Sequence, residues 1–180
     1  MKLLSTNIGE RKTVTWKNKT VETGIYKHAT KAPIFLGEED VVGDAVIDRK
    51  HHGGIDQAVY GYSFKHYEYF KKLYPDLEFE FGMFGENLTF DDLNEEEITV
   101  GSTYNLGECI LEVTKPRQPC SKLGIKFGTQ KIVKQFWNTS FSGTYFKVLK
   151  TGFVKTGDTL NLIHKQKSAS TIAEVYETKK

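Results

Sequence analysis

Short apolar runs that end at a glycine recur along the chain and limit the folds it can adopt. They occur at residues 41–44, 99–102 and 155–158, where a β-rich segment is followed by Gly-Asp or Gly-Ser. Because glycine adopts positive φ angles at no steric cost, each run can turn sharply at its end. Turns this frequent favour a sandwich or barrel of short strands over a parallel sheet with crossover helices. We therefore predict a mainly β fold with a few helical elaborations.

Alternation of apolar and polar residues predicts where the strands lie. The segments that fit are residues 103–106, 108–114, 144–150 and 159–164. In the second segment Cys109, Leu111 and Val113 share one face, and in the last segment Leu160 and Leu162 do. We expect these faces to pack in the core, with Cys109 as a small apolar residue among them.

Two segments have the periodicity of helices instead. The first covers residues 63–74, where Ser63 can cap the N-terminus and Pro75 ends the helix. The second covers residues 129–137, with Thr129 as its cap. Their apolar stripes are Tyr67, Phe70 and Tyr74 in the first helix, and Ile132, Val133, Phe136 and Trp137 in the second. We expect both stripes to pack in the core rather than to contact a ligand.

The size and charge of the chain narrow the possible functions. Its 180 residues favour one domain, which we place at residues 1–165, followed by a polar tail or short helix at residues 166–180. The formal net charge of +2 gives no broad basic surface for nucleic acid. No apolar run is long enough for a signal peptide or a membrane span. We therefore expect a cytoplasmic protein with reduced thiols and no membrane contact.

Cys120 lies in the segment with the most distinctive local chemistry. Pro116 and Pro119 stiffen the approach to Cys120, and Arg117 and Lys122 place positive charge on either side of it. Cationic surroundings favour the thiolate, which is the nucleophilic and metal-binding form of cysteine. The sequence therefore predicts an accessible and functional Cys120.

Three further clusters could bind an anion, although each by itself also fits an ordinary turn or a pair of surface lysines. Two glycines beside the histidines of residues 51–56 predict a loop that approaches a ligand closely. The His-His-Asp group in this loop is not a zinc signature, because no further ligands follow at the usual spacing. The candidate donors from the three clusters are Lys19, Lys27, His52, Asn87 and Thr89.

Five motifs, taken together and in this order, resemble those of the MOSC family, which is named for the C-terminal domain of molybdenum-cofactor sulfurases. The motifs are TGIYK at 23–27, GD at 43–44, HGGIDQA at 52–58, FGENL at 84–88 and PRQPCSKL at 116–123. The chain is most similar to the YiiM-like bacterial branch, and the likeness runs from about residue 19 to residue 163. Each motif is weak alone, but the ordered set is specific.

This resemblance implies a fold and a cofactor. The fold is a closed β-barrel related to the small barrel domain of pyruvate kinase, with a few helices. The cofactor is molybdopterin carrying molybdenum, with Cys120 as the catalytic residue and the protein ligand to the metal. The cofactor-binding residues expected on this basis are Lys19, Lys27, His52, Asn87, Thr89, Arg117 and Lys122. Arg117 suits a phosphate best, because its planar guanidinium matches phosphate oxygens.

The resemblance also implies an activity, the reduction of N-hydroxylated compounds such as hydroxylaminopurines to amines. Cleaving an N–OH bond takes two electrons and protons, which no ordinary side chain supplies, so a cofactor must carry them. The sequence contains no flavin or iron–sulfur motif, and we therefore expect a separate electron-donor reductase as partner. This sequence departs from the YiiM-like branch in one respect: members of that branch have a C-terminal helical extension, whereas the sequence ends at Lys180. The resemblance therefore does not extend to substrate choice or partner docking that depend on that extension.

Two other functions remain open at the level of sequence. The protein could be a non-catalytic carrier of the cofactor or of its sulfur, with Cys120 as the attachment point. It could also be a thiol enzyme with Cys120 as covalent nucleophile and His51 or His52 as its base. Recognition of RNA is disfavoured by the charge balance and by the absence of an interleaved aromatic and basic motif.

Overall fold

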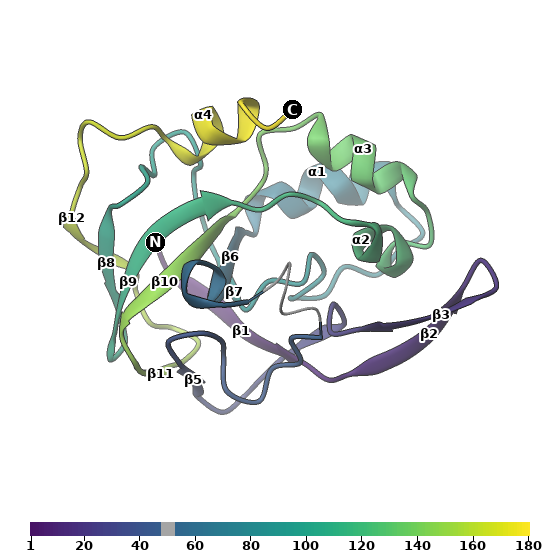
Figure 1. The fold of residues 1–180 in the computed structure, drawn as a ribbon, viewed down its shortest axis with the longest axis horizontal. Helices are drawn as coiled ribbons and strands as arrows, with labels where there is room; N and C mark the ends of the chain where they lie inside the picture. Colours follow the sequence, from purple (N-terminus) through teal and green to yellow (C-terminus); the bar gives the residue numbers. More distant parts are fainter. Residues whose placement is uncertain (48–52) are drawn as a thin grey trace.

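The structure, a computed structural model, describes residues 1–47 and 53–180 and is built mainly of short strands (Figure 1). The strands are β1 (Leu3–Gly9), β2 (Lys12–Trp16), β3 (Lys19–Thr23), β4 (Lys27–Ala29), β5 (Ile34–Leu36), β6 (Val59–Ser63), β7 (Leu88–Phe90), β8 (Thr103–Leu106), β9 (Cys109–Pro116), β10 (Thr144–Lys150), β11 (Gly152–Val154) and β12 (Asn161–His164). The helices are α1 (Lys65–Leu73), α2 (Ser121–Lys126), α3 (Lys131–Trp137) and α4 (Ile172–Glu177), with a 3-10 turn, η1 (Ile55–Gln57). The predicted mainly β fold with a few helices is confirmed.

The glycines that end the apolar runs make the turns that the sequence predicts. Gly43, Gly101 and Gly157 have φ angles of 84°, 79° and 97°. This left-handed region is costly for residues with a Cβ atom, so glycine is required for the chain to reverse there.

The main sheet has the strand order β12-β8-β9-β10-β6-β7-β1-β4. Its pairings are antiparallel except for the parallel pair β6–β7. At the far side of β1, the backbone N–H of Leu3 donates to the carbonyl of Asp158 at 2.8 Å, and Lys2 forms an isolated bridge with Thr159. These contacts link β1 to the segment before β12, although no continuous ladder joins them in the described residues. The closed barrel therefore stays a prediction that these contacts support.

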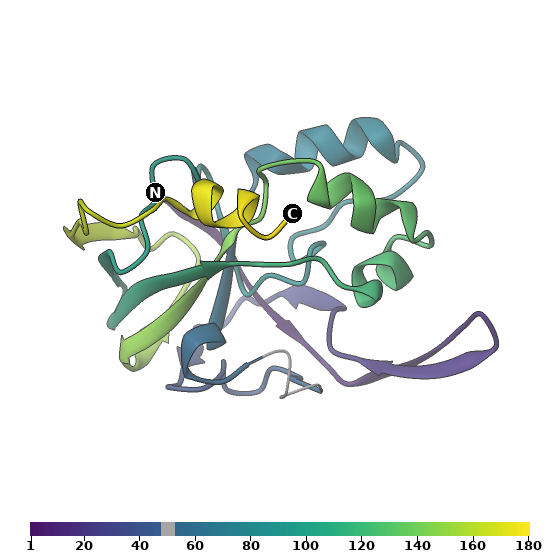
Figure 2. The same ribbon diagram turned by 45° about the horizontal axis from the view of Figure 1, so that its top comes forward.

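The interior consists of two apolar clusters. One fills the space enclosed by the sheet and includes Leu3, Phe90, Leu111 and Phe146, all fully buried. The other is rich in aromatic residues and lies beneath α1 and α3, which Figure 2 shows grouped with α2 at one end of the sheet. In this second cluster the ring centroids of Tyr62 and Phe84 are 4.6 Å apart. The second cluster thus attaches the helices to the strands. It includes Leu123 of α2, the helix that follows Cys120.

The predicted strands are found, with one error in how a face is oriented. Strands β8 and β10 have the predicted bounds, and β9 extends two residues past its predicted end. Cys109, Leu111 and Val113 are all fully buried, as expected. Leu160 is also buried, but Leu162 is 52% exposed, so the prediction that they share a buried face is wrong. The reason is that Leu160 precedes β12, which lies at the edge of the sheet and whose residues are all exposed.

The two predicted helices are present, but their predicted caps are not the N-cap residues. Ser63 is the last residue of β6, and its hydroxyl accepts a hydrogen bond from the N–H of Leu93 at 3.2 Å. The second helix begins after Gln130, although the Thr129 hydroxyl accepts from the N–H of Lys131 at 3.3 Å. Of the predicted stripes, Tyr67, Phe70, Ile132 and Phe136 are buried, whereas Tyr74, Val133 and Trp137 are only partly covered.

Helix α2, which directly follows Cys120, was not predicted. A proline-rich approach and an internal Gly124 make this segment typical of a loop. In the folded chain, Leu123 and Ile125 of α2 are buried, and tertiary packing therefore overrides the weak local propensity.

The polar C-terminal segment contains helix α4. A capping box fixes its start, because Thr171 accepts from the N–H of Glu174 and the Glu174 carboxylate accepts from the N–H of Thr171. Ile172 and Tyr176 are fully buried, and the ring of Tyr176 stacks on Trp137 with centroids 5.1 Å apart. Helix α4 is thus packed against α3.

Candidate functional site

Cys120 lies at the rim of a cavity, between the end of β9 and the start of α2. Its backbone is extended, with φ −122° and ψ 170°, and it is the N-cap residue of α2. Its side chain is partly exposed, as the sequence predicts. The cavity has a volume of about 100 Å³. Its polar lining residues include Lys27, Asp44, Gln57, Tyr60, Asn87, Arg117, Cys120, Lys122 and Tyr145.

A buried polar network forms one wall of this cavity. Lys27 at the start of β4 forms an ion pair with Asp44, which also accepts from the side-chain amide of Asn87 at 2.8 Å. The other carboxylate oxygen of Asp44 accepts from the backbone N–H of Gly9 at 2.8 Å. Burial lowers the pKa of Lys27, and the negative charge of Asp44 opposes that shift. The network thus holds a cation and an amide donor in fixed positions at the cavity wall.

Arg117 provides a second cation, and it is almost completely buried. One guanidinium nitrogen donates to the backbone carbonyl of Phe84, and the guanidinium carbon lies 5.0 Å from the centre of the Tyr60 ring. Arginine remains protonated when buried and carries five N–H donors in one plane. Arg117 is therefore held by two neighbours while it lines the cavity.

The loop that carries Asn87 is organised by the buried carboxylate of Glu86. This carboxylate accepts from the backbone N–H groups of Gly82 and Phe84 at 3.0 and 3.1 Å, and from the hydroxyl of Thr89 at 2.9 Å. It also accepts from the hydroxyl of Tyr67. Thr89 consequently lies behind the loop and is not among the residues that line the cavity, contrary to the expected binding role.

Lys126 joins two segments beneath the cavity, and sequence reasoning missed it. Its ammonium group donates to the carbonyls of Gly82 at 2.7 Å and Ile25 at 3.3 Å. Burial lowers its pKa from 10.5 to about 8. Lys122 and Lys126 are four residues apart in one helix, and this spacing could have signalled a shared face had the helix been predicted.

The close packing of two loops explains the glycine of the TGIYK motif. A Cβ atom on Gly24 would lie 1.8 Å from the carbonyl oxygen of Ala45. Any side chain at position 24 would therefore push away residues 44–46, which carry Asp44 into the cavity.

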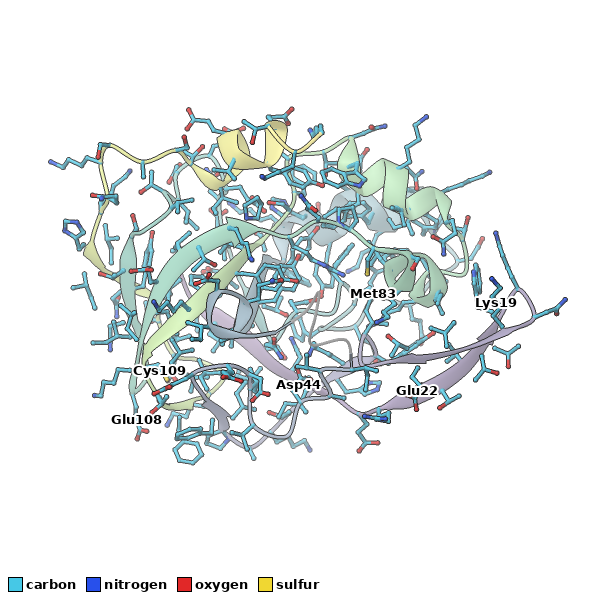
Figure 3. The ribbon with its side chains drawn as sticks, viewed as in Figure 1. Lys19, Glu22, Asp44, Met83, Glu108 and Cys109 are labelled. Atoms are coloured by element: carbon cyan, nitrogen blue, oxygen red, sulfur yellow. The ribbon has the colours of Figure 1, made fainter. Side chains whose placement is uncertain are left out.

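The structure brings together five of the predicted site residues: Lys27, Asn87, Arg117, Cys120 and Lys122. Lys19 is exposed on the β2–β3 hairpin, and Figure 3 shows it far from Asp44, so the prediction that it joins the site is wrong. A two-stranded hairpin that pairs only with itself extends Lys19 away from the cavity. His52 and His51 lie outside the described residues.

Four of the polar lining residues were not predicted as site residues: Asp44, Gln57, Tyr60 and Tyr145. Asp44 belongs to a recognised motif, but its short Gly-Asp sequence looks like an ordinary turn. Tyr60 and Tyr145 reach the cavity from the paired strands β6 and β10, and no local signal distinguishes them from core tyrosines. Burial raises the pKa of Tyr145, so its phenol stays protonated at neutral pH and can donate a hydrogen bond.

The charge of the cavity suits an anion with more than one negative charge. Lys27, Arg117 and Lys122 face a single lining carboxylate, Asp44, which leaves a formal surplus of two positive charges among the described lining residues. The cavity has room for a phosphate-sized group, and the amide of Asn87 adds a neutral donor. Cys120 at the rim offers a soft sulfur donor. These residues fit the phosphate and the metal of a molybdopterin cofactor.

No group of three or more His, Cys, Asp and Glu side chains that could hold a metal ion occurs within residues 1–47 and 53–180. Across the same residues, no helix combines the length and apolar character needed to cross a membrane.

The family model, the related sequences and the related crystal structure all point to the same family. The MOSC domain family model matches residues 48–161. The chain is 38% identical over 161 residues to the uncharacterised protein YflK of Bacillus subtilis, covering 89% of this chain and 72% of YflK. It is 34% identical over 149 residues to a reductase of Gibberella moniliformis, covering 81% of this chain but only 26% of that protein. The crystal structure of YiiM from Geobacillus stearothermophilus superposes with a TM-score of 0.81 at 31% identity, covering 99% of this chain and 83% of YiiM.

Proposed function

This chain belongs to the MOSC domain family, and we propose that it is a molybdenum-cofactor-dependent reductase that converts N-hydroxylated compounds to amines. The observation that carries the proposal is the meeting of one partly exposed cysteine with three cations in a single cavity. The likeness to a protein named a reductase supports the reaction type. We also propose that the strands close into a barrel, and that the protein works in the cytoplasm, where thiols stay reduced.

Each residue of the cavity has a distinct part in this proposal. Lys27, Arg117 and Asn87 would hold the phosphate of the cofactor, because they present buried donors in fixed positions. Lys122 would add charge at the rim, next to Cys120. Cys120 would bind the molybdenum, since a thiolate is a soft ligand that suits this metal.

The cofactor would supply what the side chains lack, namely a carrier of two electrons. In the overall reaction, R–NH–OH takes up two electrons and two protons, the N–O bond breaks, and the products are R–NH₂ and water. The protonated Tyr145 beside Cys120 can donate a hydrogen bond to the departing oxygen. Electrons would come from a separate reductase, because the sequence contains no flavin or iron–sulfur motif.

The test is to produce the protein in two bacterial hosts, one able and one unable to make the molybdenum cofactor. We expect molybdenum near one atom per chain, and reduction of N6-hydroxyadenine with an artificial electron donor, only in protein from the first host. Bound molybdenum without reduction would favour a carrier of the cofactor. Activity that resists molybdenum depletion but is lost on thiol alkylation would favour the thiol enzyme.

A further inference from the structure

A second cavity shares Cys120 with the first. Its volume is about 520 Å³, which lies within the range of roughly 300–1,000 Å³ typical of small-molecule sites. Gln57, Cys120, Lys122 and Tyr145 line both cavities, so Cys120 stands at their junction. The second cavity therefore has the size and the position to hold a reactant next to the group that Cys120 binds.

The charged side chains among the described residues that line the second cavity are all lysines. Lys115, Lys122 and Lys179 are its charged lining residues, and no carboxylate is among the described residues that line it. Three ammonium groups gathered at one cavity attract an anionic group on a ligand, in a manner that depends on ionic strength.

Helix α4 and the residues after it build one wall of the second cavity. Val175 and Lys179 line it, and the capping box described above fixes the start of the helix. The hydroxyl of Tyr176 donates to the carbonyl of Phe136 at 3.3 Å, and the N–H of Lys179 donates to the carbonyl of Tyr176 at 3.0 Å. The C-terminal wall is thus tied to α3 and places Lys179 at a defined position.

We propose that the second cavity is the substrate site and that it selects N-hydroxylated substrates carrying a phosphate or a carboxylate. This inference rests on the proposed function, because only that function makes the bound molecule a substrate. The binding test described below does not depend on that function. Lys115 and Lys179 would bind the anionic group, while Gln57 and Tyr145 contact the part of the substrate nearest Cys120. The segment after β12 then sets specificity as well as covering the core.

The direct test is equilibrium binding of amine products to protein purified from a host that makes the cofactor. Adenosine 5′-phosphate and adenosine form one pair, and 4-aminobenzoate and aniline form the other. We expect the anionic member of a pair to bind about tenfold more tightly at low salt, with the difference shrinking as ionic strength rises. A difference in the first pair alone identifies phosphate as the preferred anion, and a difference in the second pair alone identifies carboxylate.

Matched charge changes locate the site. Lys179→Glu should weaken binding of the preferred anion by roughly fivefold to tenfold and leave its neutral partner unchanged. Lys179→Gln should have a smaller effect in the same direction. Lys131→Glu makes the same change in charge on exposed α3, outside the second cavity, and should have no effect.

Clear outcomes would overturn the inference. Equal binding of the charged and neutral members in both pairs would exclude selection of an anion. Loss of all binding when the cofactor is loaded, with binding in the cofactor-free protein, would show that the cofactor itself fills the second cavity. Selective binding without any N-hydroxylamine reduction would instead count against the proposed function and leave an anion site in the second cavity.

Discussion

Strand β9 begins at one cysteine and leads to the other, and the surroundings of the two differ in almost every respect. Cys109 is the first residue of the strand, fully buried in the same apolar cluster as Leu106 and Leu111. Its burial raises the pKa of its thiol to about 11. Cys120 lies beyond the other end, partly exposed, where Arg117 and Lys122 line the same cavity. Figure 3 shows Cys109 beside Glu108, at the end of β9 far from α2.

The difference teaches that one residue type can serve stability at one position and chemistry at another position eleven residues away. A buried thiol among apolar side chains is kept neutral and behaves as a small hydrophobic group. A cysteine near cations, with access to solvent, can ionise and bind a soft metal. Exchanging either cysteine therefore probes a different property of the molecule.

Cys120→Ser should have the largest effect on activity. A hydroxyl is a poor ligand for molybdenum, so we expect reductase activity to fall by at least about 100-fold and bound molybdenum to decrease. The melting temperature should change by no more than about 2 °C, because Cys120 is not part of the core. Activity assays, metal analysis and thermal melts on the same preparation provide the comparison. Full activity with molybdenum still bound would show that the metal is held by other groups.

Arg117→Lys should have the next largest effect, and it tests whether the cavity is an anion site. The substitution keeps the charge but loses the planar fork, so we expect inorganic phosphate to bind about tenfold more weakly to the cofactor-free protein. Lys19→Arg is the matched control, because it also exchanges one basic residue for the other, at an exposed hairpin position outside the cavity. Isothermal titration measures both. Equal phosphate affinity in the two variants would argue against a binding role for Arg117.

Cys109→Ser should affect stability rather than activity. It places a hydroxyl that needs a hydrogen-bond partner among apolar side chains, at a cost of about 1–3 kcal/mol in the free energy of unfolding. Urea denaturation measures this change, and activity per folded molecule should stay within about twofold of the wild type. Cys109→Ala is the control that removes the sulfur without adding a polar group. A serine variant as stable as the alanine variant would show that the hydroxyl finds a partner.

The smallest effect is a pH dependence of stability that has opposite signs for Cys109 and for Lys126. The pKa of Cys109 is raised from 9.0 to about 11, so its contribution to stability is complete below pH 9.0 and is lost as the pH rises to about 11. The pKa of Lys126, in the helix that follows Cys120, is lowered from 10.5 to about 8. Between about pH 8 and 10.5, Lys126 is therefore more protonated in the unfolded chain than in the folded chain, and the free energy of unfolding rises with pH over this range.

Two variants separate these contributions. Cys109→Ala should remove the fall in the free energy of unfolding at high pH, and Lys126→Met should remove the rise. Urea denaturation at a series of pH values between 7 and 11 provides the measurement. Unchanged pH profiles in both variants would mean that neither group ionises differently in the folded and unfolded chain.

The sequence by itself determined the features that depend on neighbouring residues. Glycine at the end of each apolar run dictated the turns, since only the local backbone conformation matters there. The alternation in β9 identified Cys109 as a core residue, and the prolines and cations around Cys120 identified it as the distinctive cysteine. These properties are present in any conformation of the segment, so they could be recognised without the fold.

Only the tertiary structure decided which distant residues meet. Asp44 joins Lys27 and Asn87 because β1, β4 and β7 are adjacent in the sheet, whereas Lys19 is carried outward by a hairpin that pairs only with itself. Helix α2 forms because Leu123 and Ile125 are buried, despite a sequence typical of a loop. Strand register and burial are set by contacts between segments far apart along the chain, and the free energy of those contacts is not contained in any one segment.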